Sequence, residues 1–277
     1  MQKSSKIAII ITLLATALAL VFSLFVIHSL NKINDENSQV IEKINSLDDD
    51  SLSALAQSLK DSDKSKYEIE EEVEYESYSP EEYAALKHAE NSYFLENVPY
   101  INQMDAGLPS GCEGVSLTMY LNFLGYDVSP WDVCMSYMPW SWEETNMSNS
   151  FIGDPSSDGG WGCYAPVIVK TAYNYFDANG ITDKRVINMT GSGIYDIFDE
   201  IRNGHPVIIW ATESFKIPEL NITENFTWVT GEHCMLVTGY DEKNIYFNDP
   251  IYGYTSVDLK TFEKIWALLG RQAVVIH

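Results

Sequence analysis

The chain has 277 residues, with 40 acidic residues against 17 Lys and Arg and a formal net charge of −23, yet 45% of it is hydrophobic and 13% aromatic. The aromatic content excludes a disordered polyanion, and the acidic balance excludes a nucleic-acid binder with a basic face. Four cysteines are too few for a small domain held together by disulfides, so a folded core is expected.

The first predicted element is a helix over residues 7–27. These 21 residues carry no charge, and a helix of that length matches the roughly 30 Å hydrocarbon thickness of a bilayer. Its C-terminal edge lacks the small residues of a signal-peptide cleavage site. Lysines precede the span, so the positive-inside rule places the rest of the chain outside the cell. We expect residues 1–29 to be an uncleaved anchor of a single-pass cell-membrane protein whose N-terminus is cytoplasmic.

Residues 30–92 are predicted to connect this anchor to a folded domain. Apolar residues between positions 30 and 60 recur three and four apart, which indicates a weakly amphipathic helical stalk. Whether the stalk self-associates stays open, so the oligomeric state is unknown. Residues 61–99 hold three lysines and twelve acidic residues, a density typical of a solvated, self-repelling linker. Its tyrosine-flanked acidic run is interpreted as a spacer; a docking segment or a pro-region over an active site is the alternative.

A helix predicted over residues 111–124 has a cysteine in its first turn. Ser110 and Glu113 have the spacing of a capping box, and Gly125 is a natural helix stop. Cys112 then lies in the first turn, where unpaired N–H groups and the helix dipole favour a thiolate. We therefore expect the pKa of its thiol to be lowered. The alternative is a small buried cysteine without a catalytic role.

The remaining chain predicts an α+β domain over residues 93–277, because helices come first and strands mostly follow. A glycine-rich loop over residues 153–162 is as consistent with a substrate-cleft lining as with an ordinary connection. The further predicted elements are helices over 166–177, 194–202 and 259–269, strands between 206 and 257, and a last strand over 272–276. The sequence has no metal-ligand spacing and no phosphate-binding loop, so neither a metal nor a cofactor is expected.

A β-hairpin is predicted between residues 231 and 250, with a turn at 241–244. His233 opens its first strand and Asp249 closes its second, so both side chains can reach the same end of the sheet. There a carboxylate can orient an imidazole that deprotonates a thiol.

Four blocks of the sequence resemble the C39-like peptidase family, which is common in Gram-positive bacteria. The blocks are Val98-Pro99-Tyr100-Ile101-Asn102-Gln103, Leu108-Pro109-Ser110-Gly111-Cys112-Glu113, His233-Cys234-Met235-Leu236-Val237-Thr238-Gly239-Tyr240-Asp241 and Asn248-Asp249-Pro250. The resemblance implies a papain-like fold in which a helical part carries the cysteine and an antiparallel sheet carries the histidine and the aspartate.

By this resemblance, Cys112 matches the nucleophile, His233 the general base and then acid, Asp249 the orienting residue, and Gln103 the side-chain donor to the oxyanion hole. It implies a membrane-anchored, extracytoplasmic cysteine peptidase that hydrolyses peptide or amide bonds in a peptide or protein substrate. A peptidoglycan amidase or endopeptidase is a variant within this class. The alternative from another class is an inactive papain-like domain that serves as a surface binding module or an export accessory.

Overall fold

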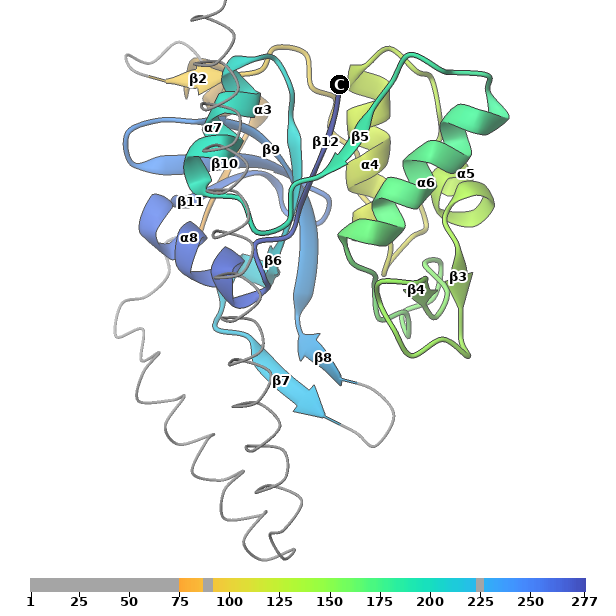
Figure 1. Cartoon of the computed structure of the whole chain (residues 1–277). Helices are drawn as coiled ribbons and strands as arrows, with labels where there is room; N and C mark the ends of the chain where they lie inside the picture. The colour runs from red at the N-terminus through yellow and green to blue at the C-terminus, as the bar shows by residue number, and fades with distance from the viewer. Residues whose placement is uncertain (1–74, 87–91, 223–226) are drawn as a thin grey trace, which may run out of the picture. The chain divides into compact units, whose positions relative to one another are not determined.

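The computed structural model describes residues 75–86, 92–222 and 227–277 (Figure 1). All of them belong to one compact unit, Ile69–His277. The expected localisation, a single-pass membrane protein with its folded domain outside the cell, is contradicted, since no helix of these described segments has the length and apolarity needed to cross a bilayer. The span predicted over residues 7–27, the stalk over residues 30–60, and residues 61–74 and 87–91 of the acidic linker lie outside the described residues.

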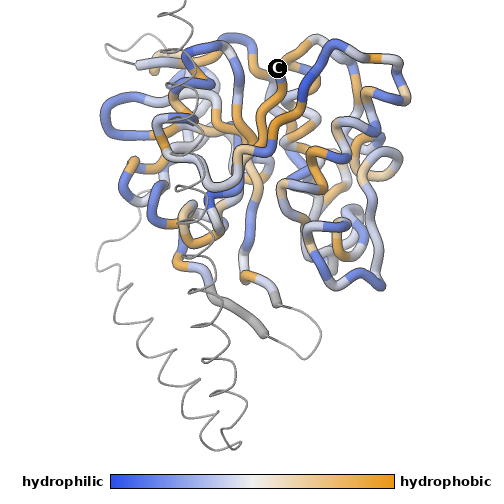
Figure 2. The backbone as a smooth tube through the Cα atoms, viewed as in Figure 1, coloured by the Kyte–Doolittle hydropathy of each residue, from blue (hydrophilic) through white to orange (hydrophobic). Residues whose placement is uncertain are grey.

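An eight-stranded antiparallel sheet runs through the unit. Its strands lie in the order β1 (Glu76–Tyr78), β11 (Gly253–Asp258), β10 (Asn244–Asp249), β9 (Glu232–Tyr240), β6 (Val207–Thr212), β12 (Ala273–Ile276) and β5 (Val186–Asn188), and β2 (Tyr93–Phe94) also pairs with β9. The central strands β6, β9 and β12 are buried along almost their whole length. Because both of their faces are covered, they form continuous apolar runs rather than alternating ones, and Figure 2 shows the apolar chain concentrated in the centre of the unit.

Helices cover both faces of this sheet (Figure 1). The helix α4 (Cys112–Phe123) packs against β9 and β6, and α6 (Ala165–Ala178) packs against β5 and β12. On the other side, α7 (Ile194–Arg202) and α8 (Leu259–Leu268) pack against β6. The shorter elements are α3 (Pro80–Leu86), α5 (Pro130–Asp132), a π-helical turn (Val133–Tyr137), a 3-10 turn (Glu213–Phe215), the parallel pair β3 (Trp140–Ser141) and β4 (Phe151–Ile152), and the hairpin of β7 (Glu219–Ile222) and β8 (Thr227–Thr230).

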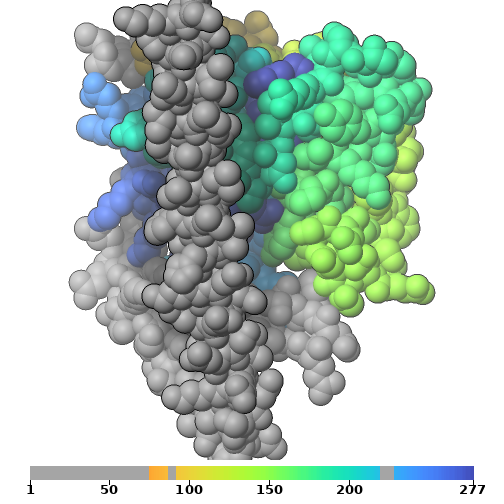
Figure 3. All heavy atoms as spheres, in the orientation of Figure 1, coloured from red at the N-terminus to blue at the C-terminus, as the bar shows by residue number. Residues whose placement is uncertain are grey.

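The mixed helix-and-strand domain predicted from the sequence is confirmed. The helix predicted over residues 111–124 is α4, and the hairpin predicted between 231 and 250 is formed by β9 and β10. In the space-filling view, the helical part around α5 and α6 forms one contiguous block beside the sheet (Figure 3). The sheet and this block are the two parts that position the candidate site.

Part of the acidic segment belongs to the fold. Its strand β1 pairs antiparallel with β11, Tyr78 lying opposite Tyr254. In α3, Tyr83 is buried, and its ring stacks on that of Tyr254 with the centroids 4.6 Å apart. The spacer interpretation is therefore wrong for residues 75–86, because tyrosines supply the apolar surface that the surrounding acidic residues lack. For the rest of the linker it stays a prediction.

The first described residue, Tyr75, joins this segment to the end of β10. Its hydroxyl donates to Oδ2 of Asp249 and lies 2.9 Å from Oγ1 of Thr255. Its ring packs against those of Phe215 and Tyr252. The segment thus contributes a hydrogen-bond donor to a buried carboxylate.

We predict that Tyr75→Phe destabilises the protein more than Tyr78→Phe does. The first change removes a hydrogen bond to a buried charged acceptor, which contributes about 1.5–3 kcal/mol. The second change, in the adjoining strand β1, removes a neutral bond to the Ser256 hydroxyl, which contributes about 0.5–1.5 kcal/mol, and a contact to an exposed glutamate that water weakens. Urea denaturation at neutral pH measures both free energies of unfolding. Equal losses would contradict the role given to Tyr75.

Candidate active site

The hairpin brings His233 and Asp249 together. Nε2 of His233 lies 2.9 Å from Oδ1 of Asp249, and the two side chains are 1% and 0% exposed. The strand register pairs Asn248 with Leu236, which makes His233 the diagonal neighbour of Asp249 on one face of the sheet. The pairing follows from strand alternation, as the sequence pattern indicates.

Asp249 is held as an ionised acceptor. Besides His233, its Oδ1 accepts the N–H groups of Ile251 at 2.8 Å and Tyr252 at 3.1 Å. Burial alone would raise the pKa of this carboxyl, but the charge and hydrogen bond of His233, together with the other donors, outweigh burial and lower it.

The pKa of the His233 imidazole shifts in the opposite direction. Burial acts to lower its pKa, whereas the charge of Asp249 and their hydrogen bond raise it, and the net effect is a raised pKa. Since Nε2 is bonded to Asp249, Nδ1 is the nitrogen that can exchange a proton with a reacting group.

Cys112 lies in the first turn of its helix, as predicted, and is the first residue of α4. The helix is buried from Cys112 to Leu121, and the cysteine itself is 6% exposed. Its thiol lies against the main chain of Cys234, the residue that follows His233. The packing of α4 on β9 therefore brings the cysteine to the strand that carries the histidine. Within the described part of the chain, the thiol donates to Oε2 of Glu113 at 3.2 Å, and no hydrogen bond joins it to His233.

The predicted capping box is wrong. The N-cap of α4 is Gly111, which makes no side-chain cap, and the Ser110 hydroxyl donates instead to the carbonyl oxygen of Ser157 at 2.7 Å. Glu113 is fully buried, and its Oε1 accepts the N–H of Cys163 at 2.5 Å. Both side chains thus bond to main-chain groups of the 153–163 region, which packs on the start of α4.

The expected lowering of the thiol pKa is also wrong. Burial raises the pKa of Cys112 well above its ordinary value, the carboxyls of Glu113 and Glu232 raise it further, and the main-chain hydrogen bond from Cys234 lowers it by less. Glu232, which precedes His233, was not predicted to belong to the site. The only signal for it in the sequence is its place beside the histidine on a strand end.

The carboxyls of Glu113 and Glu232 meet at Gly162. A Cβ at Gly162 would lie 2.7 Å from Oε1 of Glu113 and 2.7 Å from Oε2 of Glu232, and the residue has φ +106, so only glycine fits there. Burial is the main cause of a raised pKa in both glutamates. Oε1 of Glu232 is buried and has no hydrogen-bond partner within the described segments.

Gln103 is fixed between the two halves of the site. Its N–H donates to the carbonyl oxygen of Pro250 at 2.9 Å, and its Nε2 donates to that of Pro109 at 2.7 Å. The N–H of Leu108 returns to the carbonyl oxygen of Gln103 at 2.9 Å, so the intervening loop folds back on itself. Oε1 of Gln103 is buried and has no partner in the part of the chain that the structure describes. Its role in an oxyanion hole stays a prediction.

The glycine-rich loop covers the start of α4. A Cβ at Gly160 would lie 2.7 Å from Cβ of Ser110, and the neighbouring Trp161 meets Trp228 of β8 edge to face at 4.6 Å between ring centroids. The loop therefore lies beside the candidate nucleophile and touches the strand that leads into His233. Whether it lines a substrate cleft stays a prediction.

Comparisons with known proteins point to one family. The model of the Peptidase_C39 like family matches residues 95–274. The uncharacterized protein YvpB of Bacillus subtilis (strain 168) is 35% identical over 193 residues, which is 64% of this chain and 73% of YvpB. The crystal structure of a candidate C39-like peptidase from Bacillus anthracis is similar with a TM-score of 0.59 and 25% identity, and the match covers 67% of this chain and 97% of that one. With the family model matching most of its length, the chain belongs to the Peptidase_C39 like family.

Proposed function

We propose that this protein is a cysteine peptidase that hydrolyses peptide or amide bonds through an acyl-enzyme on Cys112. The observation that carries the proposal is the buried hydrogen bond between His233 and Asp249, together with the packing of the helix of Cys112 against β9, the strand of His233. A domain that only binds a partner has no use for a buried, hydrogen-bonded pair of an imidazole and a carboxylate. Ordering and desolvating these groups is instead the usual arrangement for nucleophilic catalysis.

In this mechanism, Nδ1 of His233 takes the thiol proton while Sγ of Cys112 attacks the carbonyl carbon. Asp249 stabilises the imidazolium that forms, and the imidazolium then protonates the leaving amine. Water, deprotonated by the same imidazole, attacks the thioester and releases the acid product. The N–H of Cys112, which has no partner inside the helix, and the amide of Gln103 would bind the oxyanion, where one donor contributes about 3–4 kcal/mol.

The pKa shifts at the site indicate that the thiol of Cys112 is protonated in the resting enzyme. It then loses its proton during the attack on the substrate. The pKa of Cys112 is raised by burial and by the nearby Glu113 and Glu232, so the thiol keeps its proton at neutral pH. His233 must be neutral to accept that proton, and its pKa is raised. Activity should therefore increase as the pH rises through the pKa of His233.

Substrate access requires a movement of the covering loop. Cys112 is 6% exposed and His233 is 1% exposed. The contact between Trp161 and Trp228 joins the loop to the β7–β8 hairpin. We infer that these two segments separate when a peptide enters.

We predict that Cys112→Ala abolishes hydrolysis and all labelling by a thiol-directed active-site probe, because both depend on the thiol that we propose as the nucleophile. The wild-type chain, incubated with a diverse peptide library, should yield cleavage products that mass spectrometry identifies. Cys134→Ala is the matched control, since this thiol is also buried but lies behind Gly114 in the helical part. Turnover by Cys112→Ala, or a folded wild-type chain that cleaves nothing, would contradict the proposal.

We predict that Glu113→Gln accelerates alkylation of Cys112 by iodoacetamide at neutral pH. The amide can still accept from the N–H of Cys163 but no longer raises the pKa of the thiol by its charge. Each unit by which that pKa falls increases the thiolate fraction about tenfold. Glu263→Gln, at an exposed glutamate paired with Arg271, is the control and should change nothing. An unchanged or slower reaction in Glu113→Gln would show that its carboxyl does not control the thiol.

We predict that Asp249→Asn lowers the pKa of His233 below the ordinary value of about 6.5, because burial stays and the attraction that outweighs it is lost. A loss of about 10⁴-fold in kcat should accompany the change. NMR titration of the imidazole measures the shift. A pKa that stays raised in the variant would contradict the proposed pairing.

The same pair predicts how stability depends on pH. The raised pKa of His233 gives stabilisation that is complete below its unfolded value of about 6.5 and is lost as the pH rises through the folded pKa. The lowered pKa of Asp249 gives stabilisation that is present above about 3.9 and is lost as the pH falls through the folded pKa. Asp249→Asn should remove the dependence that comes from Asp249 and reverse the one that comes from His233, because a folded pKa below about 6.5 costs stability as the pH falls.

A further inference from the structure

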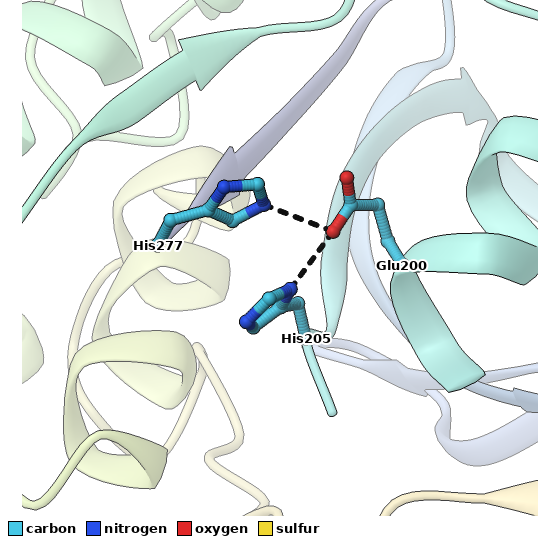
Figure 4. Close-up of side chains that lie close together, drawn as sticks. All are labelled: Glu200, His205 and His277. Atoms are coloured by element: carbon cyan, nitrogen blue, oxygen red, sulfur yellow. Dashed lines mark hydrogen bonds and ion pairs between the residues drawn. The ribbon is translucent and has the colours of Figure 1, made fainter. Parts of the chain in front are cut away.

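Two histidines and a glutamate meet outside the candidate active site (Figure 4). Oε2 of Glu200 lies 2.8 Å from Nδ1 of His205 and 3.0 Å from Nε2 of His277. The potential ligand atoms of the three side chains all lie within 4.8 Å of one another. One carboxylate oxygen and two imidazole nitrogens therefore converge on a single small volume.

The end of α7 positions two of these residues. Gly204 follows the helix with φ +91, a conformation that favours glycine. Its N–H donates to the carbonyl oxygen of Ile201 at 3.1 Å, and the N–H of His205 donates to that of Glu200 at 2.9 Å. These two bonds form a Schellman motif, which turns the chain back at the helix end. The turn sets His205 beside Glu200.

His277 reaches the cluster from the end of the sheet. Its N–H and C=O pair with those of Arg185, both at 2.8 Å, and continue the antiparallel pairing of β12 with β5. Both main-chain groups of the preceding Ile276 bond to the hydroxyl of Tyr120 in α4. Main-chain hydrogen bonds thus place all three side chains independently of the bonds among them, so an ion would not have to order the site.

The donor set suits a borderline divalent cation. Imidazole nitrogen and carboxylate oxygen bind Zn²⁺ at about 2.0–2.2 Å, so neighbouring ligand atoms of a tetrahedral site lie about 3.3–3.5 Å apart. The separations of 2.8 and 3.0 Å are a few tenths of an ångström shorter, as expected of ligands that share protons rather than a cation. Small side-chain rotations would increase these separations to the values that a zinc site needs.

Solvent can reach the fourth position of such a site. The side chains of Glu200, His205 and His277 are 17%, 30% and 39% exposed. We propose that these three residues form a zinc site whose fourth ligand is water. No sequence motif indicates it, because Glu200 and His277 are 77 positions apart.

The proposed zinc site is separate from the catalytic centre. Tyr120, which bonds to Ile276 beside the site, lies eight residues after Cys112 in α4, or about 12 Å along the helix axis. The ion would join the end of α7 to the end of β12. Its effect is therefore on stability, and binding and unfolding are the measurements that detect it.

Isothermal titration calorimetry of the untagged full chain with zinc chloride tests the proposal. We expect one Zn²⁺ bound per chain and a rise in Tm that depends on zinc concentration, because an ion that binds only the folded state stabilises it. His205→Gln and His277→Gln should each abolish zinc binding and the zinc-dependent rise in Tm. Glu263→Gln, which changes a glutamate that pairs with Arg271, should retain both.

Two further variants separate zinc binding from other effects. Cys112→Ser should bind zinc as the wild type does, since the proposed site contains no thiol. Gly204→Ala should weaken binding, because the strained turn displaces His205. If the Tm of His205→Gln or His277→Gln fell equally with and without zinc, the fall would come only from the lost hydrogen bonds. No zinc bound by the wild type, wild-type affinity in His277→Gln, or loss of binding in Cys112→Ser would each overturn the proposal.

Discussion

The packing of α4 against β9 is the contact on which the rest of the structure depends. The helix is apolar on nearly every side and buried from Cys112 to Leu121, so it can lie between the sheet and α6. At its start the thiol meets the main chain of Cys234, and one turn later the Ser116 hydroxyl lies 3.3 Å from the carbonyl oxygen of the same residue. These contacts fix the cysteine relative to the strand of His233.

The same burial decides the electrostatics of the thiol. A helix N-terminus contributes typically 0.3–1 kcal/mol towards an anion, which is less than one pKa unit at about 1.36 kcal/mol per unit. Full burial can shift a pKa by about 3–5 units in the other direction. In Cys112, burial is the largest cause of the raised pKa, and the carboxyls of Glu113 and Glu232 act in the same sense. Helix position alone is therefore a poor guide to the reactivity of a buried cysteine.

The parts of the fold that were predictable from the sequence are those whose signal is local. Gly125 ends the apolar run of α4, and two strand-forming runs on either side of a short turn indicate the hairpin that pairs His233 with Asp249. The four blocks that resemble the C39-like family identify the family that the comparisons show.

The features that escaped prediction depend on residues far apart in the chain. The donation from Tyr75 to Asp249 spans 174 positions, and Glu113 leaves its expected cap because the N–H of Cys163, 50 positions away, takes its carboxylate. The meeting of Glu200 with His277 is of the same kind. Spacing rules do not reach such contacts, which form only when segments that are distant in the sequence pack together.

The account depends most on Cys112, His233 and Gln103 acting on one carbonyl group. The most direct test is a crystal structure of the protein after reaction with a peptide aldehyde. The account predicts a covalent bond from Sγ of Cys112 to the aldehyde carbon, with the new oxygen bound by the N–H of Cys112 and Nε2 of Gln103 and with Nδ1 of His233 within hydrogen-bond reach. An aldehyde attached elsewhere, or an oxygen that points away from both donors, would contradict it.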